Sequence, residues 1–237
     1  MPRFIPTIPF DDCYGSVGDL TFFHRDGKCF YKARSQSSFA GTMLQMDHQS
    51  VHLRAIAAWQ GLTQEIQEEW NANAVGVVSH RPPFDGKSGI SGYNLFVSAY
   101  HGFATLGDEH VPSPAPWTNF PVFAVPGVDS VSTFGDDLLI NFKVKMEDSI
   151  EAGRYWLLTK LHLTKPGGGK DDGKLRNFLA SSACIPGESI VQVEVLDYLN
   201  VWDTELSAYT AHCRYLLIDG NTGYRGQYRQ MSFDFSV

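Results

Sequence analysis

The chain has 237 residues, of which 43% are hydrophobic and 13% aromatic, and it carries a formal net charge of −7. This composition excludes a disordered chain, and the length fits one large domain or two smaller ones. The negative charge argues against direct binding of nucleic acid, because phosphate contacts need a basic surface. No apolar run approaches the roughly 18 residues of a membrane span. The first residues, MPRFIPTIPFDD, also lack the apolar segment of a signal peptide, so we expect neither a membrane span nor secretion.

The N-terminal residues predict an extended arm followed by a β-hairpin. Residues 1–12 contain three prolines, which are incompatible with a continuous helix. Apolar runs flank Asp26-Gly27, a dipeptide typical of tight hairpin turns. We therefore expect strands at about 17–24 and 28–34.

Three helices are expected next. Apolar residues recur at helical spacing from Asp47 until Gly61. Thr63 is suited to cap a second helix, whose apolar side includes Trp70. A third helix is expected from Tyr93 to Leu106. The first two would form an αα-hairpin.

The second half of the chain predicts an antiparallel β-sandwich. Residues 107–118 contain three prolines and are expected to link two domains, 1–116 and 117–237. The fold class is therefore α+β, with a hairpin and an αα-hairpin before an Ig- or fibronectin-like sandwich. Short strand-like runs are expected at about 121–125, 130–134, 137–145, 154–164, 189–196, 211–219 and 227–236. Apolar and polar residues alternate within 138–145 and 230–237, as in strands that turn one side to a core.

No set of residues in the sequence indicates a metal or cofactor site. His48 and His52 have the spacing of two ligands on one helix, beside Asp47, but no third ligand is evident. Four cysteines form no closely spaced pair, so we expect buried thiols and no metal. These cysteines are Cys13, Cys29, Cys184 and Cys213.

The sequence also lacks a recognisable catalytic motif. The segments FDGKSG (84–89) and PGGGKDDGK (166–174) contain glycine and lysine but do not complete a phosphate loop, so turns are expected. A polar turn accounts for the acidic residues and the histidine of 108–110. Ser181 and Ser182 lack the setting of a hydrolase nucleophile, and Cys184 has apolar neighbours. We expect no enzyme, no catalytic residue and no cofactor.

Some aromatic residues of the sequence suggest carbohydrate binding. Tyr198, Trp202 and Tyr209 lie in a polar segment between expected strands, where they could present rings to a sugar. A carbohydrate-binding sandwich is therefore an alternative. A hydrolase or nuclease with an unrecognised site is the third.

The segments RAIAAWQGLTQEIQEEWNANA and SGYNLFVSAY resemble a pattern in uncharacterised proteins of Bacteroidetes and their tailed phages. Close matches cover about 54–74 and 88–100. The chain departs from that pattern in its first linker, QSSFAGTMLQMDHQS, and in a longer insertion at 165–188. The residues of this signature are Trp59, Leu62, Thr63, Trp70, Asn71, Gly92, Tyr93, Asn94, Leu95 and Phe96.

The resemblance implies a non-catalytic structural or assembly protein, a component of a phage or phage-derived particle. Its partners would be other structural subunits, in a homo-oligomer or a larger assembly. No nucleic acid or membrane would be contacted directly. The expected location is the virion, after synthesis in the bacterial cytoplasm.

Overall fold

The computed structural model describes residues 15–17, 19–25, 28–33, 43–77, 89–202 and 207–236. By internal contacts the chain separates into two compact units, 1–46 and 47–237. The expected boundary at 116/117 stays a prediction. The expected N-terminal arm and the loop at 84–88 lie outside the described residues.

The first unit contains a small antiparallel sheet. Its strands β1 (Gly15–Val17), β2 (Leu20–Arg25) and β3 (Lys28–Ala33) are arranged in the order β1-β2-β3. The strands on either side of Asp26-Gly27 are therefore paired, as the sequence predicts. Strand β1 was not expected.

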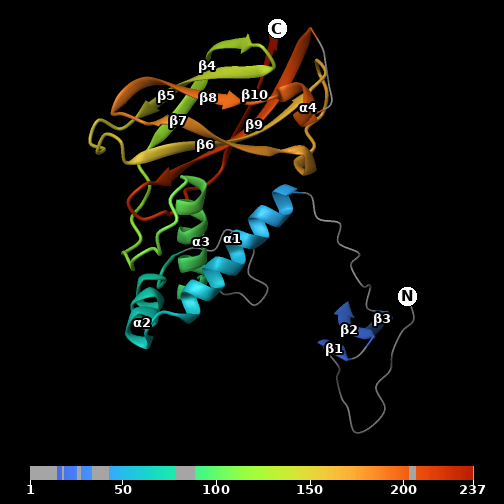
Figure 1. Ribbon diagram of the computed structural model, residues 1–237, viewed down its shortest axis with the longest axis vertical. Coiled ribbons are helices and arrows are strands. Elements are labelled where there is room, and N and C mark those ends of the chain that lie inside the picture. The colour runs from blue at the N-terminus through green and yellow to red at the C-terminus, as the bar shows by residue number, and fades with distance from the viewer. Residues whose placement is uncertain are drawn as a thin grey trace. The chain divides into compact units, whose positions relative to one another are not determined.

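Three helices follow, and all but the first turn of α1 belongs to the second unit: α1 (Met43–Gln60), α2 (Gln64–Asn73) and α3 (Gly92–Thr105). Helix α1 begins four residues before the expected start at Asp47. Thr63 caps α2, because its hydroxyl accepts a hydrogen bond from the backbone N–H of Ile66 at 3.5 Å. The helices gather at one end of a large sheet (Figure 1).

That sheet has seven strands in the order β10-β9-β6-β7-β8-β5-β4, and all its pairs are antiparallel. The predicted combination of helices with a large antiparallel sheet is therefore confirmed. A short helix α4 (Tyr198–Trp202) and a 3-10 turn η1 (Asp172–Lys174) lie in its connections. The strands are β4 (Phe123–Phe134), β5 (Asp137–Met146), β6 (Tyr155–Thr164), β7 (Arg176–Ala183), β8 (Gly187–Val195), β9 (Ala208–Asp219) and β10 (Arg229–Ser236).

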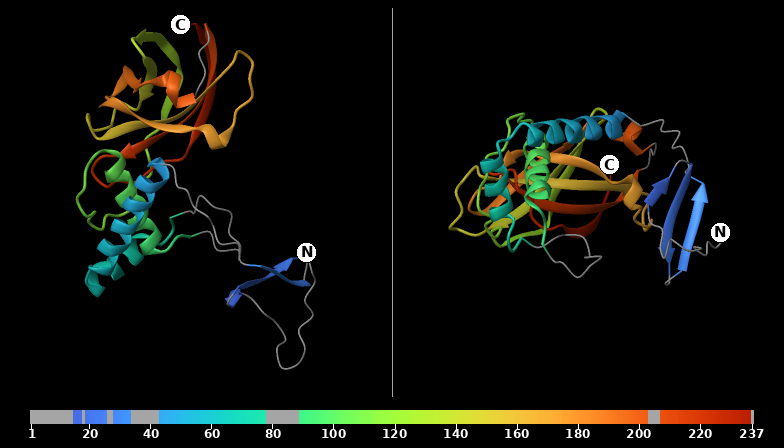
Figure 2. Two further views of the ribbon diagram at one scale, coloured as in Figure 1. Left: turned by 45° about the vertical axis from the view of Figure 1, so that its right-hand side comes forward. Right: turned by 90° about the horizontal axis from the view of Figure 1, so that it is seen from below.

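The sheet bends around one apolar core, to which every strand contributes. Its edges approach each other, since the Arg229 guanidinium in β10 donates to the carbonyl of Phe123 in β4. The curvature can be followed in Figure 2. In β5, Leu138, Ile140 and Phe142 point into this core, which confirms the alternation predicted there.

Two expectations for the strands were wrong. The runs at 121–125 and 130–134 form one strand, β4, because bulges let it continue past Pro126 and Gly127. The expected insertion at 165–188 contains β7 and the start of β8. Strand β7 was missed because Ala180 is its one fully buried residue, so it shows no apolar alternation.

Aromatic packing joins the helices to the sheet. Tyr224, in the connection between β9 and β10, contacts the ring of Trp70 in α2 with 6.4 Å between centroids. Its hydroxyl donates to the carbonyl of Ala115 at 2.6 Å. None of the helices in the described ranges combines the length and apolarity that a membrane crossing needs.

Candidate functional site

The residues of the family-like signature pack together where the three helices meet. Trp59 lies against Tyr93 and Phe96, with centroids 5.7 and 5.4 Å apart, and Trp70 meets Phe96 edge-on at 5.4 Å. The Asn71 side chain accepts from the backbone N–H of Gly92 at 3.1 Å. These contacts hold α2 against the start of α3.

The absence of a side chain at Gly92 makes the close approach of α2 and α3 possible. A Cβ on Gly92 would lie 2.5 Å from the backbone nitrogen of Asn71. Ser91 caps α3 by accepting from the N–H of Asn94 at 3.3 Å. Leu95 is buried, whereas Leu62 and Thr63 lie at the turn between α1 and α2. The signature therefore encodes packing and capping.

Histidines from two helices come together beside this core. His52 Nδ1 in α1 lies 3.4 Å from His101 Nε2 in α3, and the His48 ring stacks on His101 at 4.7 Å. Burial, followed by the charges of Arg225, His48 and His52, lowers the pKa of His101 to about 4. Within the described ranges, no three His, Cys, Asp or Glu side chains are arranged to hold a metal ion.

The other motifs singled out in the sequence are engaged in local contacts. His110 pairs with Asp108 at 2.7 Å and lies against the Phe103 ring, which agrees with a polar turn. The Ser181 hydroxyl donates to the carbonyl of Gln192 at 3.2 Å. Cys184 is buried, and burial raises the pKa of its thiol to about 11.

The aromatic candidates for sugar binding are placed differently from the expectation. Tyr198 and Tyr209 are buried in the sheet core, where their rings lie 6.1 Å apart. The Trp202 indole N–H donates to the carbonyl of Lys174 at 3.1 Å, and its ring packs near Phe178. The expectation that Tyr198 and Tyr209 are exposed was wrong.

A different group of polar side chains lies on the outer surface of β6, β9 and β10. Their neighbours along each strand point into the core, so strand alternation directs these side chains outward. The antiparallel register places them in three rows across the strands. This polar face consists of Lys160, Arg214 and Gln230, then His162, His212 and Ser232, then Thr164, Thr210 and Asp234.

The connection between β6 and β7 folds back over this face. The backbone N–H of Gly167 donates to the Thr210 hydroxyl at 2.9 Å, and Thr210 donates to Asp234. A Cβ on Gly168 would lie 2.9 Å from Thr164, so glycine is required for this close approach. The segment 166–174, expected as a turn, is thus fastened to the strands.

Charged residues of the same connection form ion pairs with the polar face and with each other. Asp172 accepts from Arg214 at 2.8 Å and lies 3.2 Å from the Lys170 ammonium. Hydrogen bonding from Lys170, and also the charge of Arg214, lowers the pKa of Asp172. Asp171 donates its backbone N–H to His162 Nδ1 at 3.1 Å.

At the centre of the face, His212 connects a hydroxyl to the covering connection. His212 Nδ1 lies 2.9 Å from Ser232 Oγ, and its Nε2 lies 2.8 Å from the carbonyl oxygen of Gly168. A hollow of about 390 Å³ adjoins these groups. Lys170, His212, Gln230 and Ser232 contribute to its lining.

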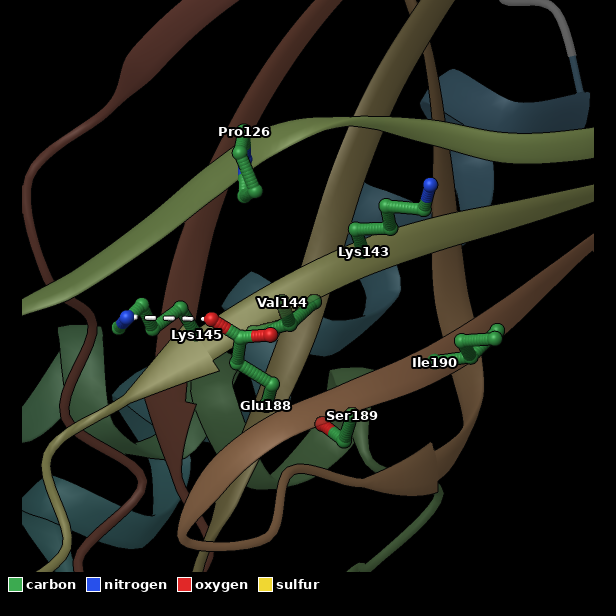
Figure 3. Close-up of a pocket in the computed structure, with 7 residues that line it drawn as sticks. All are labelled: Pro126, Lys143, Val144, Lys145, Glu188, Ser189 and Ile190. Carbon is green, nitrogen blue, oxygen red and sulfur yellow. Dashed lines mark hydrogen bonds and ion pairs between the residues drawn. The ribbon is translucent and has the colours of Figure 1, made fainter.

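A second hollow, of about 290 Å³, lies at the bulge of β4 and is shown in Figure 3. Its two ammonium groups are paired, Lys145 with Glu188 at 3.1 Å and Lys143 with Asp129 at 3.3 Å. The Ser189 hydroxyl is buried and has no hydrogen-bond partner among the described residues. None of the described residues that line this hollow is a histidine, so we place the candidate site on the polar face.

Comparisons with known proteins leave the family open. No family model and no curated protein matches the sequence. OgpA from Akkermansia muciniphila is 16% identical over 56% of this chain and 34% of its own, with a TM-score of 0.32. Beta-glucosidase 3B from Thermotoga neapolitana, in complex with alpha-D-glucose, is 15% identical over 58% and 20%, with a TM-score of 0.19. The chain thus spans about a third or less of these proteins, and such TM-scores establish no common fold.

Proposed function

We propose that the chain is a carbohydrate-binding module whose binding site is the polar face. The observation that carries this proposal is the hollow beside His212 and Ser232, together with an exposed aromatic ring at the same face. Tyr228 is 46% exposed, and the Lys160 ammonium lies 5.0 Å from the centre of its ring. Because Lys160 shares a row with Gln230, this ring adjoins the polar side chains.

The chemistry of the face suits a ligand with many hydroxyl groups. Sugar hydroxyls both donate and accept, and the face offers a hydroxyl, an amide, a carboxylate and an ammonium. The Thr210–Asp234 and Arg214–Asp172 contacts orient several of these groups in advance, which lowers the entropic cost of binding. An aromatic ring beside such groups can pack against the apolar side of a sugar ring.

Glycan-array screening of the whole chain, followed by titration of the best ligand, tests this proposal. We expect Tyr228→Ala and Gln230→Ala each to weaken binding at least about tenfold. Phe134→Ala is the matched control, because Phe134 is 79% exposed but does not belong to the polar face. Absence of binding to every glycan, or unchanged binding by Tyr228→Ala, would remove the proposal.

An assembly role is the second candidate, and the sheet of the first unit favours it. Phe22 lies opposite Tyr31 on one face, with centroids 6.4 Å apart, and Phe23 lies opposite Phe30 on the other, at 5.8 Å. Successive strand residues point to opposite faces, so both faces carry an aromatic pair. The four rings are only partly buried, so a subunit that packs on either face would bury further apolar area.

Self-association of the full chain is the measurable consequence. We expect sedimentation velocity to show a concentration-dependent oligomer and Phe23→Ser to shift it toward the monomer. A full chain that sediments as a monomer at all concentrations would argue against self-assembly. The virion location and the Ig- or fibronectin-like character of the sheet stay predictions.

A further inference from the structure

The hydrogen-bonding pattern of His212 fixes which of its ring nitrogens carries the proton. A backbone carbonyl only accepts hydrogen bonds, so the contact at 2.8 Å to Gly168 requires Nε2 to be protonated. In the neutral ring, Nδ1 then presents a lone pair to Ser232 Oγ at 2.9 Å. The Ser232 hydroxyl must therefore donate its proton to His212.

This polarity is the one that an activated serine needs. A nucleophilic hydroxyl requires a base within hydrogen-bond reach, and the base requires a third group that holds its orientation. Ser232, His212 and the Gly168 carbonyl occupy these three positions. His212 and Ser232 lie directly opposite each other on β9 and β10, so paired strands set their separation.

The neighbouring groups hold this arrangement in place. The N–H of Gly168 donates to the carbonyl of Lys165 at 2.8 Å, which fixes the carbonyl that orients His212. The His162 ring lies 6.2 Å from that of His212. Burial, and secondarily the charge of His212, lowers the pKa of His162, which favours its neutral form. When His212 takes up a proton, His162 therefore adds no second positive charge beside it.

The Ser232 hydroxyl is also accessible from the hollow. Ser232 is exposed, so a substrate can reach its hydroxyl. The side chain of Lys170 lines the same hollow, with its ammonium 3.2 Å from the Asp172 carboxylate.

We propose that Ser232 is a nucleophile for acyl transfer from esters, with His212 as its general base. Ser232 Oγ bonds to the ester carbonyl carbon while its proton moves to His212 Nδ1. Collapse of the tetrahedral oxyanion breaks the bond to the alcohol, which takes the proton from His212. Water then attacks the acyl-serine by the same route, and the net reaction converts ester and water to acid and alcohol. This activity goes beyond carbohydrate binding and does not depend on it.

Labelling with a fluorophosphonate probe tests the proposal directly. The full chain is incubated with the probe, and the modified residue is located by mass spectrometry of peptides. We expect one label, at Ser232, forming at least about tenfold more slowly in His212→Gln and absent in Ser232→Ala. Ser181→Ala is the control, because the Ser181 hydroxyl donates to the carbonyl of Gln192 and not to an imidazole. Its labelling should equal that of the unmodified sequence.

Two results would overturn the proposal: no label at Ser232, or equal labelling rates with and without His212. A second readout is hydrolysis of p-nitrophenyl acetate, which should show a burst in the full chain and none in Ser232→Ala. A full chain that binds glycan but gives no label at Ser232 would overturn the nucleophile and leave the carbohydrate proposal intact. A chain that binds no glycan but labels at Ser232 would support the nucleophile alone.

Discussion

Gly102 in α3 and Gly223 in the connection between β9 and β10 lie too close for either to carry a side chain. A Cβ on Gly102 would lie 1.8 Å from the carbonyl oxygen of Gly223, and a Cβ on Gly223 would lie 2.4 Å from that of Ala99. Gly223 also has a φ of +70°, which favours glycine. The helices and the large sheet are thus joined by direct backbone contact.

Gly102→Ala is expected to separate these backbones and destabilise the second unit. The added methyl group meets backbone atoms, which cannot rotate away, so a loss of at least about 3 kcal/mol in the free energy of unfolding is expected. Urea unfolding followed by tryptophan fluorescence measures it. Gly127→Ala is the control, because no atom lies within 4 Å of a Cβ there. Equal stability of the two variants would contradict the close approach.

Trp70 is expected to dominate the stability of the helical core. Its side chain is fully buried among Phe96, Ala99 and Tyr224. Trp70→Ala should therefore cost about 3–5 kcal/mol of unfolding free energy. The control is Glu69→Ala, an exposed neighbour on α2.

A second substitution at this position keeps an aromatic ring but removes the polar nitrogen. The Trp70 indole nitrogen is buried and has no hydrogen-bond partner among the described residues. Trp70→Phe removes that unsatisfied donor along with part of the volume, so its cost should be well below that of Trp70→Ala. A cost as large as that of alanine would contradict this expectation, because phenylalanine keeps much of the buried volume and leaves no unsatisfied donor.

The positions of helices and strands could be predicted from the sequence where a capping residue or an alternation of apolar residues marked them. Thr63 marked the start of α2 because its hydroxyl replaces a missing backbone partner. Alternation in β5 and β10 marked their inner faces, since each strand packs one side on the core. Strand β7 carries no such pattern and was missed.

The polar face could not be predicted, because its rows depend on strand pairing. His162, His212 and Ser232 come from three strands, and β6 and β9 pair although two strands intervene in sequence. A shift of one residue in register would turn each strand's side chains to the opposite face. The alternation in β10 did expose Ser232 as an outward residue, but nothing in the sequence gave it a histidine partner.

His101 should make stability depend on pH. Its pKa is about 4 in the folded chain and near 6.5 when unfolded, so the unfolded chain binds more protons between these values. The associated stabilisation is present above pH 6.5 and is lost as pH falls toward 4. Between pH 7 and pH 5 the loss should be about 1–2 kcal/mol.

Urea unfolding of the full chain and of His101→Gln at both pH values isolates this effect. The unfolding free energy of the variant should fall less between pH 7 and pH 5, whatever its level at pH 7. Identical pH dependence would mean that His101 does not resist protonation.

The thiols of Cys184 and Cys213 should be unreactive in the folded chain. Both are buried, and burial raises their pKa values to about 11 and about 12. Thiol reagents attack the thiolate, so both access and ionisation oppose the reaction. In a Cys13→Ser, Cys29→Ser variant, a colorimetric thiol assay should find essentially no reactive thiol at pH 7 and two after denaturation. Rapid reaction of either thiol in the folded variant would contradict the core packing of β9 or of the residue that follows β7.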